Sequence, residues 1–180
     1  LPTFLKTAKK LQLRYPNLIV YIPSCRRNFD EKFRKGLEKY EIKGKVISQQ
    51  DDAELIPYIY SLAKLALCKS GTVNMELALY GIPQIIGYRV SRVTAFIAKR
   101  ILNFKVRFIS PVNLLMKKFI IPEFVQKNFI EEKIFYKACR LLDLTSEKAK
   151  IKKGYTLLKK ELGEEGVVDR AAKEIINSII

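Results

Sequence analysis

Short apolar runs alternate with amphipathic segments from Leu18 to Ser110, and this alternation constrains the fold more than any other feature of the sequence. Each run has the length of a buried β-strand, and each intervening segment has the spacing of a helix. The runs are Leu18–Ile22, Val46–Ser48, Leu65–Cys68, Gln84–Tyr88 and Val106–Ser110, and the helical segments are Phe29–Tyr40, Ala53–Ala63, Val73–Tyr80 and Ser91–Leu102. Strands that alternate with helices predict an α/β fold, with a Rossmann-like parallel sheet between two layers of helices.

The C-terminal part of the chain lacks this alternation. After Pro122 the apolar runs stop, and helical spacing predicts a helical tail over residues 131–180. The helices expected there are Glu131–Leu142, Ser146–Leu162 and Val167–Ile179. No linker or repeat divides the sequence, so we expect residues 1–180 to form a single domain.

The first residues predict a helix of their own. Its inner face would carry Leu5, Ala8, Leu11 and Leu13, and no Ser, Asp or Asn stands before it as a cap. We therefore expect the sequence to begin inside an α/β unit, truncated at its N-terminus, with a strand and a loop ahead of Leu1 in a longer protein.

The formal net charge of the chain is +16 at pH 7. This excess predicts attraction to polyanions such as phosphorylated substrates, anionic lipid or nucleic acid, although AT-rich coding accounts for abundant lysine equally well. The three cysteines lie far apart and there is no histidine, which excludes zinc sites and His-dependent triads and favours a reducing, cytosol-like compartment. No apolar stretch approaches the ~20 residues that cross a bilayer.

A Ser-Gly-Thr turn stands between an apolar run and a helix, with Glu76 one turn into that helix. Parallel sheets bind ligands at the carboxyl ends of strands, where the first N–H groups of the next helix lack partners. Gly71 lets the backbone approach a phosphate, the hydroxyls of Ser70 and Thr72 can donate hydrogen bonds, and a carboxylate suits sugar hydroxyls. The same residues also suit a capping turn with Thr72 as N-cap, which the tripeptide alone favours.

A second strand is expected to end beside this turn. It follows the Gly-Ile-Pro turn at residues 81–83 and ends with Gly87, Tyr88 and Arg89. A glycine, an aromatic ring and a cation would then meet the Ser-Gly-Thr turn at one edge of the sheet. This convergence favours a binding site over a capping turn.

Three stretches, in their order and spacing, resemble the lipid-A-disaccharide synthases, a family of two-domain GT-B glycosyltransferases. They are LCKSGTVNMELALYGIPQIIGYRVS, VTAFIAKRIL and ISPVNLLMKKFIIPEFVQ, and the resemblance is densest from Ala66 to Gln126. Ser-Gly-Thr with a downstream Glu is common to many sugar-nucleotide enzymes. Gly-Tyr-Arg followed by Ser-Pro-x-Asn-Leu-Leu and Pro-Glu-x-x-Gln is far more specific.

This resemblance implies a UDP-sugar site. The diphosphate would be held by Ser70, Gly71 and Thr72, and the ribose would be met by Glu76. Asn113 would help to fix the nucleotide sugar, although an Asn that only closes a turn is an equal alternative.

Four further positions match the motifs of the family. Tyr88 and Arg89 would line the same cleft, and Arg89 would either meet charge that develops on the leaving UDP or pair with an acid at the sheet edge. Glu123 and Gln126 are motif positions to which the resemblance assigns no role.

Members of the family join UDP-2,3-diacylglucosamine to 2,3-diacylglucosamine 1-phosphate with inversion and release UDP, so the resemblance implies this donor and this acceptor as partners. It implies no cofactor, and the sequence has no Asp-x-Asp metal motif. Family members also have an N-terminal domain, which supplies the catalytic base, and a Gly-Ser-Arg loop, and neither is present here. We therefore expect a donor-binding half that is inactive alone, and we assign no catalytic residue.

Acylated substrates imply peripheral contact with the anionic inner membrane from the cytoplasmic side. Residues 91–102 suit this role with an apolar stripe and three cations, but a core helix fits the periodicity better. The resemblance also implies a homodimer that exchanges the helices from Ser146 onward.

Other functions compete with this one. They are another GT-B UDP-sugar transferase or an epimerase, a structural protein that has lost its enzyme half, and a basic nucleic-acid-binding module. We expect no nucleic-acid partner, because neither an RNP stretch nor a Gly-x-x-Gly loop is present.

Overall fold

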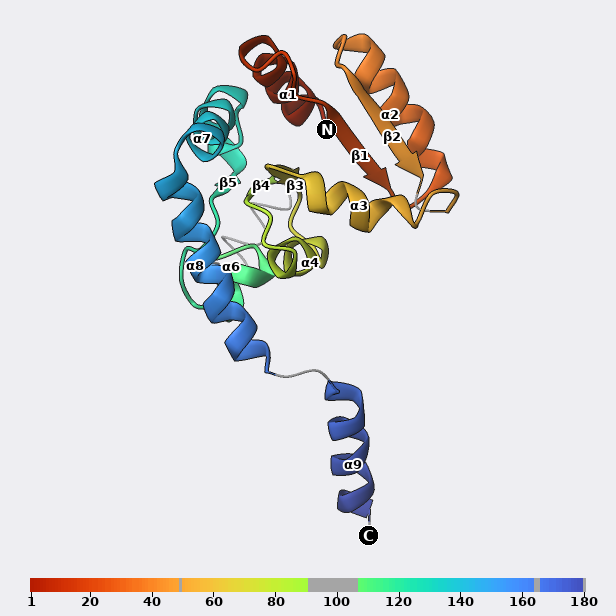
Figure 1. The fold of residues 1–180 in the computed structure, drawn as a ribbon, viewed down its shortest axis with the longest axis vertical. Helices are drawn as coiled ribbons and strands as arrows, with labels where there is room; N and C mark the ends of the chain where they lie inside the picture. Colours follow the sequence, from red (N-terminus) through yellow and green to blue (C-terminus); the bar gives the residue numbers. More distant parts are fainter. Residues whose placement is uncertain (49, 91–106, 164–165, 180) are drawn as a thin grey trace.

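The computed structural model describes residues 1–48, 50–90, 107–163 and 166–179. Its strands are β1 (Val20–Ser24), β2 (Gly44–Ser48), β3 (Ala66–Cys68), β4 (Gln84–Tyr88) and β5 (Glu123–Val125). They form two parallel sheets, one of order β1-β2 and one of order β3-β4-β5 (Figure 1).

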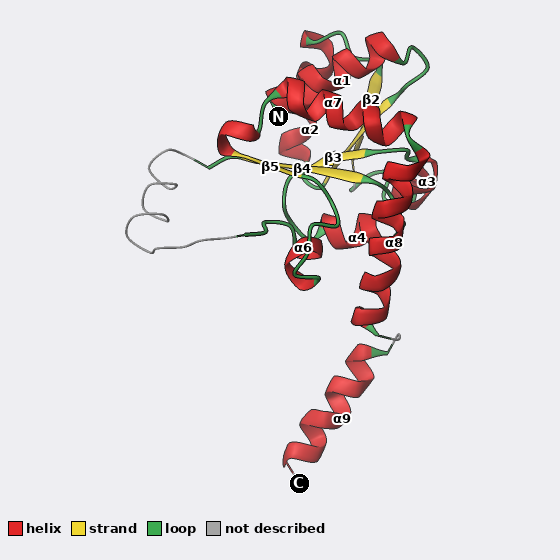
Figure 2. Ribbon diagram, turned by 90° about the vertical axis from the view of Figure 1, so that its left-hand side faces the viewer, coloured by secondary structure: helices red, strands yellow, loops and turns green. Residues whose placement is uncertain are grey.

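Helices lie on both faces of these strands, which confirms the predicted fold class. The helices are α1 (Pro2–Arg14), α2 (Arg27–Lys39), α3 (Leu55–Leu62), α4 (Val73–Leu79), α6 (Pro111–Leu115), α7 (Glu131–Asp143), α8 (Thr145–Leu162) and α9 (Val167–Ile179), with a 3-10 turn, η2, at Gln126–Asn128. Figure 2 shows α1 and α7 on one face of β3, β4 and β5, and α4 and α6 on the other.

Adjacent residues of β2 show how the two layers form. Val46 is buried with Leu5 of α1 and Leu37 of α2, in a cluster that also takes in side chains of β1. Ile47 is buried with Ile56 of α3 and with side chains of α4. Successive side chains of a strand point to opposite faces, so α1 and α2 share one face of β2 and α3 lies on the other.

The largest core surrounds β4, whose Ile85 and Ile86 are fully buried. From α7 the side chains of Ile134, Ala138 and Leu141 pack there, and from α8 those of Ile151, Tyr155 and Leu158. The helix α8 is therefore part of the main core. By contrast, α9 extends away from the rest of the chain (Figure 1).

Two predictions about the strands were wrong. Residues 107–110 do not form a strand, because the N–H groups of Ile109 and Ser110 donate to the carboxylate of Glu123 at 2.8 and 2.9 Å. The strands also do not stop at Pro122, since β5 follows it and pairs with β4 in the register Ile86 to Glu123.

Two helices also need comment. In α1, Leu5, Ala8 and Leu11 are buried as predicted, but Leu13 is 72% exposed because it lies on the opposite side of the helix.

The predicted helix at residues 91–102 lies outside the described residues. No helix of the described part is both long enough and apolar enough to cross a membrane.

Candidate functional site

The Ser-Gly-Thr turn lies between β3 and α4, and side-chain hydrogen bonds hold its shape. The N–H of Gly71 donates to Asn74 Oδ1 at 2.9 Å, and Asn74 Nδ2 donates to the carbonyl of Lys69 at 3.2 Å. Ser70 Oγ donates to the carbonyl of Ile109 at 2.7 Å, which ties the turn to the segment before α6. The turn is therefore fixed on both sides.

Asn74 is a site residue that the sequence reasoning missed. Its side chain is fully buried, and its backbone carbonyl accepts a hydrogen bond of 2.9 Å from Gln84 Nε2 on β4. Gln84 also donates to the hydroxyl of Tyr155, which donates in turn to the carbonyl of Ile82 at 3.0 Å. Because every member of this buried network has a partner, it is expected to make the turn rigid. The spacing Gly-x-x-Asn was the available signal.

Thr72 and Glu76 lie on the exposed side of the turn. Thr72 stands at the N-cap position, yet its side chain makes no capping hydrogen bond. The Thr72 hydroxyl therefore does not cap α4, as the alternative interpretation of the turn would require. Within the described part of the chain, the N–H groups of Thr72 and Val73 have no acceptor. The turn thus presents free donors beside an exposed hydroxyl.

The carboxylate of Glu76 faces α3. Burial raises the pKa of the Tyr60 hydroxyl to about 12, and the negative charge of Glu76 adds to this rise. The ring of Tyr60 packs edge-on against that of Tyr80, with 5.2 Å between the centroids. Glu76 therefore lies next to an aromatic pair, one turn of helix beyond Thr72.

Of the residues expected to meet the turn at the end of β4, Tyr88 contacts Lys69, the residue before the turn, whereas Arg89 contacts the backbone of Gln126 and Phe129 instead. The ammonium of Lys69 lies 5.6 Å from the centroid of the Tyr88 ring, a cation–π distance that joins residues from neighbouring strands. Lys69 is exposed and was not singled out from the sequence, where it was one lysine among many. This contact holds the Lys69 ammonium directly before the Ser-Gly-Thr turn.

Arg89 points toward the 3-10 turn η2. Its Nη2 donates to the carbonyl of Phe129 at 2.7 Å and more weakly to that of Gln126 at 3.4 Å, and its guanidinium lies over the Phe129 ring. Gln126 has a positive φ of 51°, and Arg89 binds its carbonyl. In this arrangement Arg89 fixes η2, and Gln126 contributes backbone to that contact.

Asn113 and Glu123 form a second network, which we call the clamp. Asn113 is fully buried: its Nδ2 donates to the carbonyl of Ile121 and to Glu123 Oε1, both at 2.8 Å, and its Oδ1 accepts from the N–H groups of Ile120 and Ile121. The contacts of Asn113 therefore agree with the alternative in which its side chain closes a turn. Its side chain is not exposed to a ligand in this structure.

Glu123 is the acidic half of the clamp. Its carboxylate accepts hydrogen bonds from the N–H groups of Ile109 and Ser110, from the Ser110 hydroxyl and from Asn113. The carbonyl of Ile109 accepts the hydrogen bond from Ser70. The two motifs Ser-Pro-x-Asn and Pro-Glu-x-x-Gln thus bind each other and together hold the Ser-Gly-Thr turn.

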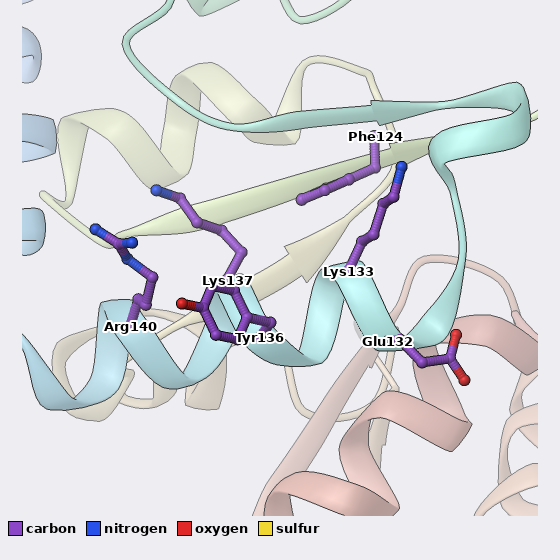
Figure 3. A pocket seen from close by; sticks show the side chains of 6 residues that line it. All are labelled: Phe124, Glu132, Lys133, Tyr136, Lys137 and Arg140. Carbon is purple, nitrogen blue, oxygen red and sulfur yellow. The ribbon is translucent and has the colours of Figure 1, made fainter.

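A pocket of about 520 Å³ lies elsewhere, between β5 and α7 (Figure 3). Its lining residues are Phe124, Glu132, Lys133, Tyr136, Lys137 and Arg140. The charges there are mostly paired: Lys137 and Arg140 contact Glu147 at 2.6 and 2.9 Å. The pocket shares no residue with the predicted site, and its paired cations offer little to an anionic ligand.

Parallel strands with helices on both faces, and a Ser-Gly-Thr turn at a strand's carboxyl end, define a Rossmann-like α/β domain. Comparison with known proteins then identifies the family. A family model described as "Lipid-A-disaccharide synthetase" matches residues 1–179. The chain belongs to this family, which confirms the resemblance.

Several curated relatives are named lipid-A-disaccharide synthase. The protein of Prochlorococcus marinus (strain MIT 9313) is 45% identical over 98% of this chain and 45% of its own length. That of Gloeothece citriformis (strain PCC 7424) is 35% identical over 99% of this chain and 45% of its own length. That of Synechocystis sp. (strain ATCC 27184 / PCC 6803 / Kazusa) is 34% identical over 98% of this chain and 44% of its own length. The chain spans a little under half the length of these relatives.

Proposed function

We propose that this chain is the donor-binding part of a lipid A glycosyltransferase. The complete reaction joins UDP-2,3-diacylglucosamine to 2,3-diacylglucosamine 1-phosphate and releases lipid A disaccharide 1-phosphate and UDP. The observation that carries the proposal is the match of residues 1–179 to the family. It favours this function over an epimerase or a nucleic-acid-binding module.

The UDP diphosphate is proposed to bind at the Ser-Gly-Thr turn. The free N–H groups of Thr72 and Val73, the Thr72 hydroxyl and the Lys69 ammonium are donors or cations that suit a phosphate. Glu76 is proposed to accept hydrogen bonds from the ribose, because it lies on the same side of α4 as Thr72. Tyr88 lines this site through its contact with Lys69.

The remaining motif residues are proposed to act by positioning. Glu123 and Asn113 hold the carbonyl that anchors Ser70, so they support the diphosphate site without touching the ligand. Arg89 fixes η2 and the backbone of Gln126. The base that activates the acceptor hydroxyl is assigned to no residue of this chain, and we propose that the chain alone does not catalyse transfer.

Two partners complete the proposal. Acylated substrates require access to a lipid surface, so we place the enzyme peripherally on the cytoplasmic side of the inner membrane. A homodimer through the C-terminal helices is supported by the exposed apolar side chains of Val168, Ile175 and Ile176 on α9, which are 76, 59 and 56% exposed.

Titration of the chain with UDP tests the site. Thr72→Ala and Glu76→Ala are expected to weaken binding by about tenfold or more each, since a hydrogen bond to a charged group is worth ~1.5–3 kcal/mol. Thr156→Ala and Glu161→Ala are matched controls at exposed positions of α8 and should bind UDP as the wild type does. Equal affinity in all five proteins would disprove the site.

A further inference from the structure

The helix α8 lies beside α4, the helix that follows the Ser-Gly-Thr turn (Figure 2). Its Tyr155 is 2% exposed and belongs to the main core, together with Ile151 and Leu158 of the same helix. The Tyr155 hydroxyl accepts a hydrogen bond of 3.0 Å from Gln84 Nε2 and donates one of 3.0 Å to the carbonyl of Ile82. A buried hydroxyl of α8 is therefore bonded to two residues at the entry to β4.

The Ile82 carbonyl fixes the direction of these hydrogen bonds. A carbonyl oxygen can only accept, so the Tyr155 hydroxyl gives it its single proton and can only accept from Gln84. The Nε2 end of the Gln84 amide must therefore face Tyr155, and its second proton is left for the carbonyl of Asn74, at 2.9 Å. Tyr155 thus determines which end of the Gln84 amide meets Asn74.

The oxygen end of the Gln84 amide agrees with this orientation. Its Oε1 lies 3.5 Å from Cys68 Sγ, which donates to it. Burial raises the pKa of the Cys68 thiol to about 12, so the thiol keeps its proton at neutral pH. Cys68 Sγ accepts in turn from Asn74 Nδ2 at 3.3 Å. Gln84 therefore binds Asn74 directly through its nitrogen and indirectly through Cys68.

Asn74 passes this constraint to the turn. Its Nδ2 faces Cys68 and the carbonyl of Lys69, which leaves Oδ1 to accept the N–H of Gly71 at 2.9 Å. Among the described residues, apart from the chain neighbours of Gly71, none has an atom within 4 Å of where a Gly71 Cβ would stand. This hydrogen bond, rather than side-chain packing, therefore holds Gly71, and the free N–H groups of the next two residues follow directly after it.

We propose that Tyr155 is a positioning residue of the diphosphate site and acts on it through Gln84 and Asn74. The inference rests on the proposed function, because it names what keeps the Ser-Gly-Thr turn in the shape that binds UDP. Loss of the hydroxyl frees the Gln84 amide to rotate, and a rotated amide would set Oε1 against the Asn74 carbonyl. The helix α8 therefore contributes to donor binding from behind the site.

Titration with UDP measures the effect. Tyr155→Phe is expected to weaken UDP binding by about threefold to tenfold, the range that one neutral hydrogen bond is worth. Tyr15→Phe is the matched control, because Tyr15 packs against the same core and its hydroxyl donates to Asp143 at 2.7 Å, and not to a residue of the turn. This control should bind UDP as the wild type does.

A double variant shows whether the effect passes through Gln84. Gln84→Met keeps the length of the side chain, removes both of its N–H groups and should weaken UDP binding by itself. In the Gln84→Met background, Tyr155→Phe is expected to have no further effect, because the link that it would break is already absent. Independent effects of the two changes, which multiply in the dissociation constant, overturn the proposal.

Amide exchange tests the same link without UDP. Gly71 and Ile121 are a matched pair, because each N–H donates to an asparagine Oδ1, that of Asn74 at 2.9 Å and that of Asn113 at 3.0 Å. A general loss of stability does not speed exchange at Gly71 selectively, whereas loss of the link does. The ratio of the Gly71 rate to the Ile121 rate should rise about threefold to tenfold in Tyr155→Phe and should not rise in Tyr15→Phe.

The outcomes separate this inference from the proposed function. If the wild type binds UDP and Tyr155→Phe binds it equally well, the inference is overturned and the proposed site stands. An exchange ratio that does not rise in Tyr155→Phe also overturns the inference, whatever the affinity for UDP. If the wild type does not bind UDP, the proposed function fails and the inference fails with it.

Discussion

Replacement of Asn113 by Asp probes the clamp with a change of one atom type. Asn113 Oδ1 accepts two backbone hydrogen bonds, and an aspartate oxygen does the same. The other oxygen would replace Nδ2, which donates to the Ile121 carbonyl and to Glu123 at 2.8 Å. An ionised Asp at position 113 therefore places a buried negative charge against a carbonyl and a second carboxylate.

The size of the effect follows from burial and charge. A fully buried carboxyl beside a like charge has its pKa raised by about three units from ~3.9, and each unit is worth ~1.4 kcal/mol. The folded state then binds the proton more tightly than the unfolded state, so the variant loses stability as pH rises through the folded pKa. The pH-dependent deficit against wild type is expected to be about 1.5 kcal/mol at pH 5 and about 4 kcal/mol at pH 8.

Urea unfolding at both pH values measures this deficit, with the wild type at the same pH as the reference. Asn128→Asp is the matched control, because Asn128 is exposed and its Oδ1 accepts from the ammonium of Lys133 at 2.6 Å. A carboxylate at position 128 would form an exposed ion pair with Lys133. The free energy of unfolding of Asn128→Asp should therefore stay within about 1 kcal/mol of wild type at both pH values.

The reasoning is refuted if Asn113→Asp is as stable as wild type at pH 8, or if its deficit is the same at pH 5 and pH 8. The first result would mean that the side chain is not enclosed by Glu123 and the Ile121 carbonyl. The second would mean that loss of a hydrogen bond, and not the charge, causes the effect.

Two further predictions concern glycines and thiols. Gly87→Ala should cost about 1–3 kcal/mol of unfolding free energy, because the new Cβ would meet the Phe129 ring and lie 2.6 Å from Phe4 Cζ. Gly71→Ala, where no atom lies within 4 Å, should keep wild-type stability in the same urea experiment yet weaken UDP binding. Burial raises the pKa of the Cys68 thiol to about 12, so iodoacetamide at pH 8 should alkylate exposed Cys25 first and Cys68 only after unfolding, as read by mass spectrometry. Equal labelling of both thiols in the folded protein would contradict this.

The sequence was sufficient to predict those helices and strands in which apolar side chains recur at a regular spacing. Gln84–Tyr88 is a strand as predicted, because a short, mainly apolar run of this length is typical of a buried strand. The tail helices also begin within one residue of their predicted starts, since each has a clear apolar face.

The sequence was insufficient where a side chain competes with the backbone. Residues 107–110 have the composition of a strand, but Glu123 binds two of their N–H groups from 13 and 14 residues away in sequence. β5 is only three residues long and begins with that glutamate, so no period could reveal it. Asn74 is similar, because its partner Gln84 is placed by β4.

The union of α8 with the sheet sets a limit on how far this domain can be shortened. Tyr155 reaches Gln84 and Ile82, and Gly154 lets Ile120 approach the helix so closely that a Cβ would collide with its side chain. A trimmed version that ends at Asp143 would leave β4 uncovered on this side and the Gln84 amide without its hydroxyl partner. We therefore expect the smallest independently folding version to extend through Leu162, because side chains of α8 and β4 share one core.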